Sequence, residues 1–106
     1  MKVIYKYQIP FKETVELELP KDARIIRVED VDGEFFLWAV VETNEDHPQE
    51  KRFFELYKTG QEIKSPITEL NYLGNCKIFI GQELCLYVFE NLKKSAQWNT
   101  ANYQQL

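Results

Sequence analysis

The single histidine is the residue of this chain with the most versatile chemistry. His47 lies in a polar stretch beside Pro48. A nucleophile–histidine–carboxylate set would require His47 to pack against a serine or cysteine. A surface loop disfavours such packing. We therefore expect His47 to be exposed and non-catalytic.

The two cysteines offer redox or metal chemistry. Cys76 and Cys85 lie on two segments that we expect to pair as strands, so their thiols could be direct or diagonal neighbours. A metal site would need two further ligands at suitable spacing, which the sequence lacks. Disulfides are rare in the cytosol, the compartment we expect. The prediction is two buried, reduced thiols, with no metal and no cofactor.

Aromatic side chains could stack a nucleotide base if several shared one exposed sheet face. Aromatic residues on strands more often pack into a core. The candidates for such a platform are Tyr5, Tyr7, Trp38, Phe53, Tyr57 and Tyr87. The cations best placed to meet a phosphate are Lys2, Lys6, Arg24 and Arg27. The candidate ligand-binding set is therefore Tyr5, Tyr7, Tyr87, Arg24 and Arg27.

Acid–base catalysis has no evident pair of carboxylates. The acids on polar faces and in turns, Glu16, Glu18, Glu29 and Asp30, form no recognisable general acid and base. The sequence contains no glycine-rich phosphate loop, HExxH or GxSxG motif. We therefore expect a protein that is not an enzyme.

The C-terminal stretch carries two aromatic residues in polar surroundings. Trp98 and Tyr103 follow the cations Lys93 and Lys94. Isolated aromatics in a polar segment anchor to a partner, or dock back on the same chain or on a symmetry mate. The candidate partner-binding set is Lys93, Lys94, Trp98 and Tyr103.

Composition restricts the class of protein that positions these residues. The chain has 106 residues, 44% of them hydrophobic, with a formal net charge of −4. One domain with a real core follows from this length and composition. The negative charge disfavours a general nucleic-acid binder, although it leaves room for a local basic patch. We find no signal peptide and no apolar run of membrane-spanning length, and expect a cytoplasmic protein.

The apolar run at residues 35–41, FFLWAVV, is the stretch around which the fold is organised. Its aromatic and β-branched residues predict a central strand covered on both faces. Asp32 and Gly33 precede it and predict a tight hairpin, with Val31 near Glu34. Gly74 predicts a bulge or a close backbone approach in a later strand.

Period-2 alternation or apolar character predicts strands over residues 2–9, 14–19, 23–31, 35–41, 52–59, 69–80 and 83–90. Residues 20–22 form a turn, residues 44–50 a polar flexible loop, and residues 61–68 an irregular connection with room for one helical turn. The fold class is mainly β: a compact antiparallel sandwich or small barrel of about seven strands. It occupies residues 1–90, and residues 91–106 form a polar tail, flexible or short-helical.

Six stretches in this order resemble a family of small, uncharacterised proteins of tailed phages and prophages. They are IYKYQI (4–9), LPKDARIIRV (19–28), LWAVV (37–41), RFFELYKTG (52–60), YLG (72–74) and LYVFE (86–90). Members of that family commonly have Gly-Thr where Gly74 and Asn75 stand, and a histidine at the place of Tyr87. The resemblance covers residues 2–90 and implies a phage or prophage gene expressed in a bacterial cytoplasm. It implies no activity and transfers no catalytic residue.

These observations leave three functional hypotheses. The first is a non-enzymatic phage accessory protein that binds a host or phage protein through sheet edges and the tail, in counter-defence or host take-over. The second is a small-ligand or nucleotide binder with an aromatic pocket, and the third is a minor virion component. An exposed edge strand would favour a homodimer. We expect neither a membrane nor a nucleic acid as the partner.

Overall fold

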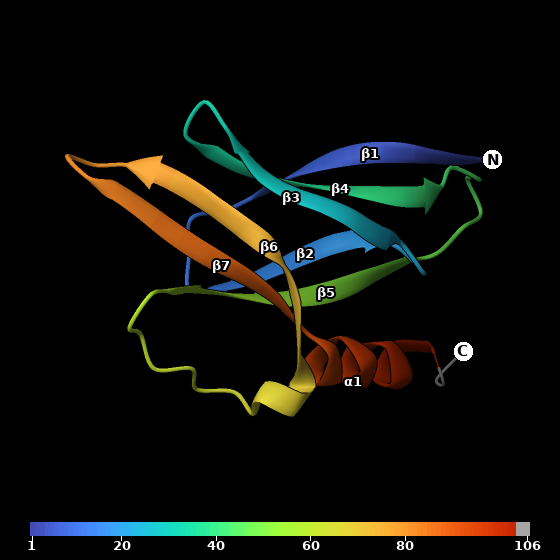
Figure 1. Cartoon of the computed structure of the whole chain (residues 1–106). Helices are drawn as coiled ribbons and strands as arrows, with labels where there is room; N and C mark the ends of the chain where they lie inside the picture. Colours follow the sequence, from blue (N-terminus) through green and yellow to red (C-terminus); the bar gives the residue numbers. More distant parts are fainter. Residues whose placement is uncertain (104–106) are drawn as a thin grey trace.

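The computed structural model describes residues 1–103, and side chains up to residue 101. Seven strands form two antiparallel sheets, and a helix follows them (Figure 1). The elements are β1 (Lys2–Ile9), β2 (Thr14–Pro20), β3 (Arg24–Val31), β4 (Glu34–Glu42), β5 (Gln49–Lys58), η1 (Ile67–Glu69), β6 (Leu70–Phe79), β7 (Glu83–Asn91) and α1 (Leu92–Tyr103). Sheet A has the order β1-β4-β3, and sheet B the order β2-β5-β7-β6. The predicted mainly-β class is confirmed, as a two-sheet arrangement rather than a closed barrel.

The β3–β4 hairpin forms as the sequence predicts. Val31 pairs with Glu34, and both turn residues have positive φ, 51° at Asp32 and 82° at Gly33. Positive φ at both central positions is the mark of a type I′ turn, whose twist matches that of the flanking strands. This local turn places β4 in the middle of sheet A.

The prediction that β4 is covered on both faces is wrong for one face. Phe35, Leu37, Ala39 and Val41 are almost completely buried against sheet B. The alternate residues, among them Phe36 and Trp38, are only half-buried. A three-stranded sheet in a two-layer fold packs one face on the core, so the other face of β4 remains at the surface.

The core fills the space between the two sheets. Its fully buried side chains are Leu19, Leu37, Val41, Phe54, Cys76 and Val88. At one side of the sandwich β3 lies against β6, where Gly74 sits at a register shift of β6 with φ of 151°. A Cβ at Gly74 would lie 3.3 Å from the Cβ of Val28. The predicted bulge and close backbone approach are both confirmed.

Strand β5 begins earlier than the sequence indicates. Gln49 and Glu50, which we assigned to a polar loop, pair with Pro20 and Leu19 of β2. Glu50 is buried because its carboxylate accepts a hydrogen bond from the Asp22 backbone N–H and lies 3.7 Å from the guanidinium of Arg52. The polar composition of residues 49–50 did not indicate a strand, because Glu50 is tolerated there only through its pairing with Arg52 inside the fold.

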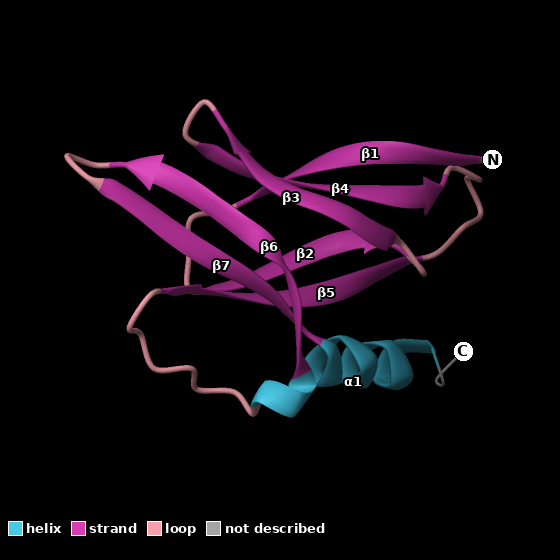
Figure 2. Cartoon of the chain, viewed as in Figure 1, coloured by secondary structure: helices cyan, strands magenta, loops and turns pink. Residues whose placement is uncertain are grey.

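Residues 91–103 are not a free tail. Helix α1 follows β7 directly and packs beside the first half of β5 (Figure 2). Ser95 is buried, and its Oγ accepts a hydrogen bond of 3.0 Å from the Phe53 N–H and donates one of 3.0 Å to Glu90. The helix thereby satisfies the Phe53 N–H, which lies just beyond the pairing of β5 with β7.

Candidate functional site: the outer face of sheet A

The residues with catalytic potential lie apart. The Nε2–H of His47 donates to the carbonyl of Lys21 at 2.7 Å, so this half-buried side chain ties the loop to the β2–β3 turn. Cys76 and Cys85 are both free thiols, but Cys85 is half-buried rather than buried. Cys76 pairs with Leu86 and Cys85 with Lys77, so the two thiols lie on opposite faces of sheet B. Burial raises the pKa of Cys76 to about 12.

The candidate ligand-binding residues are distributed over three surfaces. Tyr5 and Tyr7 pair with Ala39 and Leu37, on the inner side of sheet A. Arg24 and Arg27 pair with Val40 and Trp38, on its outer side. Tyr87 lies on the outer side of sheet B, next to Tyr72. The structure therefore does not bring these five side chains into one pocket.

The candidate partner-binding residues belong to α1. The ammonium of Lys93 forms an ion pair of 3.3 Å with Glu69, and the backbone N–H of Lys94 donates to the side chain of Asn91. Trp98 is half-buried. Tyr103 ends the helix, and its side chain lies outside the described residues. The helix uses its first residues to dock on its own chain.

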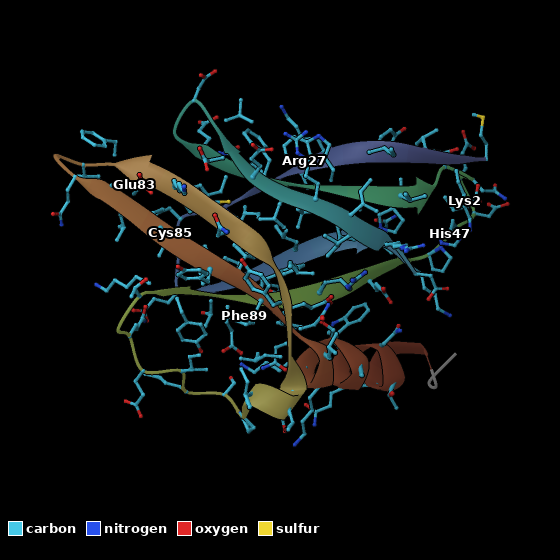
Figure 3. All side chains as sticks on the ribbon, viewed as in Figure 1. Lys2, Arg27, His47, Glu83, Cys85 and Phe89 are labelled. Carbon is cyan, nitrogen blue, oxygen red and sulfur yellow. The ribbon has the colours of Figure 1, made fainter. Side chains whose placement is uncertain are left out.

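The outer side of sheet A gathers a different set of side chains. The pairing register places Lys6, Trp38 and Arg27 in one row across β1, β4 and β3. We name this surface the Trp38 face, defined by Lys2, Lys6, Arg24, Arg27, Phe36 and Trp38. Figure 3 shows Arg27 and Lys2 extending from sheet A, whereas Phe89 lies on sheet B. Four of these six residues are the cations that the sequence indicated for a phosphate.

Cations lie over the aromatic rings of the Trp38 face. The Lys6 ammonium is 4.3 Å from the centroid of the Phe36 ring and 6.0 Å from that of Trp38. The guanidinium carbon of Arg27 is 4.3 Å from the centroid of the Trp38 ring. Cation–π attraction holds these long side chains flat and lowers the exposure of the rings. The result is a surface on which two aromatic rings and two cations lie in direct contact.

Three glutamates also lie on the outer side of sheet A, beside the cations of the Trp38 face. Glu29 forms an ion pair with Arg27, and Glu42 with the N-terminal ammonium. Hydrogen bonding by the N-terminal ammonium lowers the pKa of Glu42. Glu34 belongs to the hairpin end of β4. Among the described residues, no carboxylate forms an ion pair with Lys2, Lys6 or Arg24.

Phe36 is the member of the Trp38 face that we did not select from the sequence. The available signal was parity: residues 36, 38 and 40 alternate with the buried residues 35, 37, 39 and 41. Because the whole run is apolar, its composition does not reveal which parity faces the core. Only the register with β1 and β3 assigns Phe36 to the side of Lys6.

Part of the outer side of sheet B is covered by a loop. The segment between β5 and β6 lies over Glu55, which is 4% exposed. The carboxylate of Glu55 accepts hydrogen bonds from the Tyr57 hydroxyl, from Ser65 at 2.7 Å and from Asn91 at 2.7 Å. Burial alone would raise the pKa of Glu55, but these donors outweigh it and lower the pKa below its ordinary value. This network anchors a loop and commits both oxygens of the buried carboxylate to hydrogen bonds within the chain.

A second buried network joins the end of the core to α1. The guanidinium of Arg52 donates to both carboxylate oxygens of Glu90 and, at 2.7 Å, to the carbonyl of Ala23. Its side chain is only 14% exposed, and that of Glu90 4%. The buried charges of Arg52 and Glu90 are therefore paired with each other, as burial of charge requires. We assign Arg52 a structural role.

Several pockets lie along sheet B. One of about 460 Å³ is bordered by β2, β5 and Lys94 of α1. A second, of about 380 Å³, lies beside Phe11 and has Leu56 in its wall. A third, of about 340 Å³, lies beside Arg52 and α1. Tyr5, Tyr7 and Tyr87 line none of these three. No group of three or more His, Cys, Asp or Glu within residues 1–103 is arranged to hold a metal ion.

Comparison with known proteins gives a family match. No curated protein and no solved structure is significantly similar to this chain. The helices within residues 1–103 include none with the length and apolar character of a membrane span. A family model matches residues 1–99, which contain both sheets and most of α1. The chain therefore belongs to the family described as "Domain of unknown function (DUF7352)".

Proposed function

We propose that this chain is a non-enzymatic binding module that uses the Trp38 face to bind an acidic segment of another protein. The observation that carries the proposal is the grouping of Lys2, Lys6 and Arg24, cations without an ion-pair partner among the described residues, around the Phe36–Trp38 pair. No helix or strand of the described chain packs on this surface. In a protein of net charge −4, such a local set of cations requires an explanation.

The chemistry of the face suits recognition of a carboxylate-rich surface. Tryptophan and arginine are the residue types that most often dominate the energy of protein interfaces. Carboxylates of a partner would replace water around Lys6 and Arg24, while its apolar side chains would pack on the edges of Phe36 and Trp38. Charge complementarity of this kind accelerates association and makes binding sensitive to salt.

The resemblance to tailed-phage proteins supports a host or phage protein as the partner. In that setting the module acts in the bacterial cytoplasm, and counter-defence or host take-over is the corresponding biological role. The family match to a domain of unknown function is compatible with this origin and carries no activity of its own. An assignment as a minor virion component lacks a structural feature that favours it.

A second candidate is the binding of a nucleotide or single-stranded nucleic acid on the same face. It is favoured by the same combination of two aromatic rings with cations above and beside them. Two features make it the second choice: cations already cover the ring faces, and Glu29 lies beside Arg27. A base would have to displace Lys6 and Arg27 before it could stack.

Fluorescence titration distinguishes the two candidates. In a Trp98→Phe background, Trp38 becomes the only tryptophan and reports directly on the face. The probes are a peptide of alternating glutamate and leucine and a deoxythymidine oligonucleotide of equal charge. We expect the peptide to change the Trp38 emission, with an affinity that falls as salt rises. A response to the oligonucleotide alone would reverse the order of the candidates.

A charge-matched control isolates the contribution of the face. Replacing Lys6 and Arg24 by glutamate should weaken peptide binding at least about tenfold. Replacing the exposed Lys58 and Lys64 by glutamate changes the net charge equally, but on other parts of the surface. Equal loss in both double variants would show that only net charge matters, and would refute the proposed site.

A further inference from the structure

The four edge strands of the two sheets differ in how they are protected. The edges of β3 and β6 lie against each other, and each contains a register shift. The edge of β2 includes Pro20, which has no N–H, and the acidic Glu16 and Glu18. Strand β1 carries the charged Lys2 and Lys6, but it spans eight residues without a proline or a register shift, and no strand of the described chain lies on its outer edge. An edge of this kind is a template for another strand.

Hydrogen bonding to β4 identifies which backbone groups of β1 point outward. The Thr43 N–H donates to the carbonyl of Met1, and these two residues lie opposite each other in the β1–β4 register. Hydrogen-bonded and non-hydrogen-bonded pairs alternate along an antiparallel ladder. Val3, Tyr5 and Tyr7 therefore bond to β4. The residues whose N–H and C=O groups face the open edge are Lys2, Ile4, Lys6 and Gln8.

Exposure along β1 supports contact at this edge. Ile4 is 58% exposed and Tyr5 is 51% exposed, although both lie in the middle of the strand. Ile4 points to the outer side of sheet A and Tyr5 to the inner side. A strand added at the edge would cover apolar surface on both sides of the sheet.

Charge and the length of the overlap together select one register for the pairing of β1 with a second copy of itself. A two-fold axis at Lys6 would place the two Lys6 ammoniums opposite each other, and an axis at Ile4 would place Lys2 opposite Lys6. An axis at Tyr5 instead pairs Ile4 with Lys6 and Lys2 with Gln8. Those are the residues with outward backbone groups, and about eight backbone hydrogen bonds would form.

We infer that the chain forms a homodimer through antiparallel pairing of two β1 strands, centred on Tyr5. The occupant to which we commit is a second copy of this chain, because in the Tyr5-centred register β1 covers the exposed Ile4 and Tyr5 of its mate and opposes no lysine to a lysine. The two copies of sheet A become one six-stranded sheet. A two-fold axis perpendicular to that sheet keeps both Trp38 faces on the same side and doubles the binding surface.

The dimer rests on the β1 edge and not on the proposed function, and it is tested without any partner. Light scattering coupled to size exclusion should give twice the 12.7 kDa mass of one chain. Ile4→Lys would place an ammonium opposite Lys6 of the second copy and should return the mass to that of one chain. Ile26→Lys makes the same change at an exposed position of β3 and should leave the dimer intact.

Cysteine cross-linking tests the register. In a Cys85→Ser background, Tyr5→Cys places two sulfurs across the two-fold axis, within the short Cα separation that a disulfide requires. Mild oxidation should therefore produce a covalent dimer. Tyr7→Cys is the matched control, because residue 7 would lie opposite Val3 and roughly 13 Å from its own mate.

Three outcomes would overturn the inference. The first is a wild-type protein that remains a single chain at concentrations up to about 1 mM, which would mean a dissociation constant too weak for a specific dimer. The second is a dimer that Ile4→Lys leaves unchanged. The third is cross-linking that is equal at positions 5 and 7, or stronger at position 7, since either would assign another register or a random collision.

Discussion

Two arginines show how differently the two sheets use charge. Arg27 lies on the surface of sheet A, with a side chain 54% exposed over Trp38. Arg52 lies at the end of the core of sheet B, 14% exposed, between Glu50 and Glu90. Charge that is buried must be paired to be tolerated, whereas exposed charge contributes little to stability and is available to a partner. The buried charge of sheet B therefore contributes to the stability of the fold, whereas the charge on the outer side of sheet A is open to a partner.

Removal of Arg52 should have the largest effect on stability. Arg52→Ala leaves two buried carboxylates without their counter-ion and the carbonyl of Ala23 without its donor. Breaking such a pair typically costs about 3–5 kcal/mol of unfolding free energy. Urea unfolding followed by circular dichroism measures it. An Arg52→Met variant keeps much of the packing, and equal stability of Met and wild type would remove the role we assign to the charge.

Acid should destabilise the protein through Glu55. Because its pKa is lowered in the folded state, Glu55 stabilises the fold above its unfolded pKa, and this stability is lost as pH falls through the folded pKa. Glu55→Gln should flatten that part of the dependence of unfolding free energy on pH and cost about 1–3 kcal/mol at neutral pH.

Ser65→Ala is the graded control for Glu55. It removes one of the three hydrogen-bond donors to the carboxylate and leaves the charge in place. We expect a smaller loss of stability and a pH dependence that is reduced but not abolished. A pH dependence identical to that of Glu55→Gln would mean that the loop contact, and not the carboxylate, sets the acid sensitivity.

The Trp38 face should contribute least to stability. Arg27→Ala removes one cation–π contact and one exposed ion pair, and should change the unfolding free energy by no more than about 1 kcal/mol. The same urea titration used for Arg52 measures it. A loss as large as that of Arg52→Ala would erase the distinction between the two sheets and would recast the face as part of the folding core.

Much of the fold could be predicted from the local sequence. The Asp32–Gly33 turn was predictable because positive φ at two successive residues is a property of those residues themselves. The strands were predictable because alternation of side chains has a period of two wherever one face is buried. The bulge at Gly74 was predictable because glycine is the residue that accepts both that backbone conformation and the close approach of Val28.

The candidate site was visible only in parts. Lys2, Lys6, Arg24 and Arg27 were selected as cations that could share a face, and the structure brings them together. The tyrosines grouped with two of them lie elsewhere, because the partner of each strand is set by packing at long range. No local pattern indicates that β1 pairs with β4 rather than with β2.

The sequence by itself determined the number and type of most elements, because backbone preferences and side-chain alternation act over a few residues. The tertiary structure alone decided which elements are neighbours. It turned Glu50 from a loop residue into a buried partner of Arg52, and docked α1 on β5 through Ser95. It also left Trp38 half-buried at the surface, among cations from two other strands. These outcomes depend on burial and on pairing between distant residues, which act only once the chain has folded.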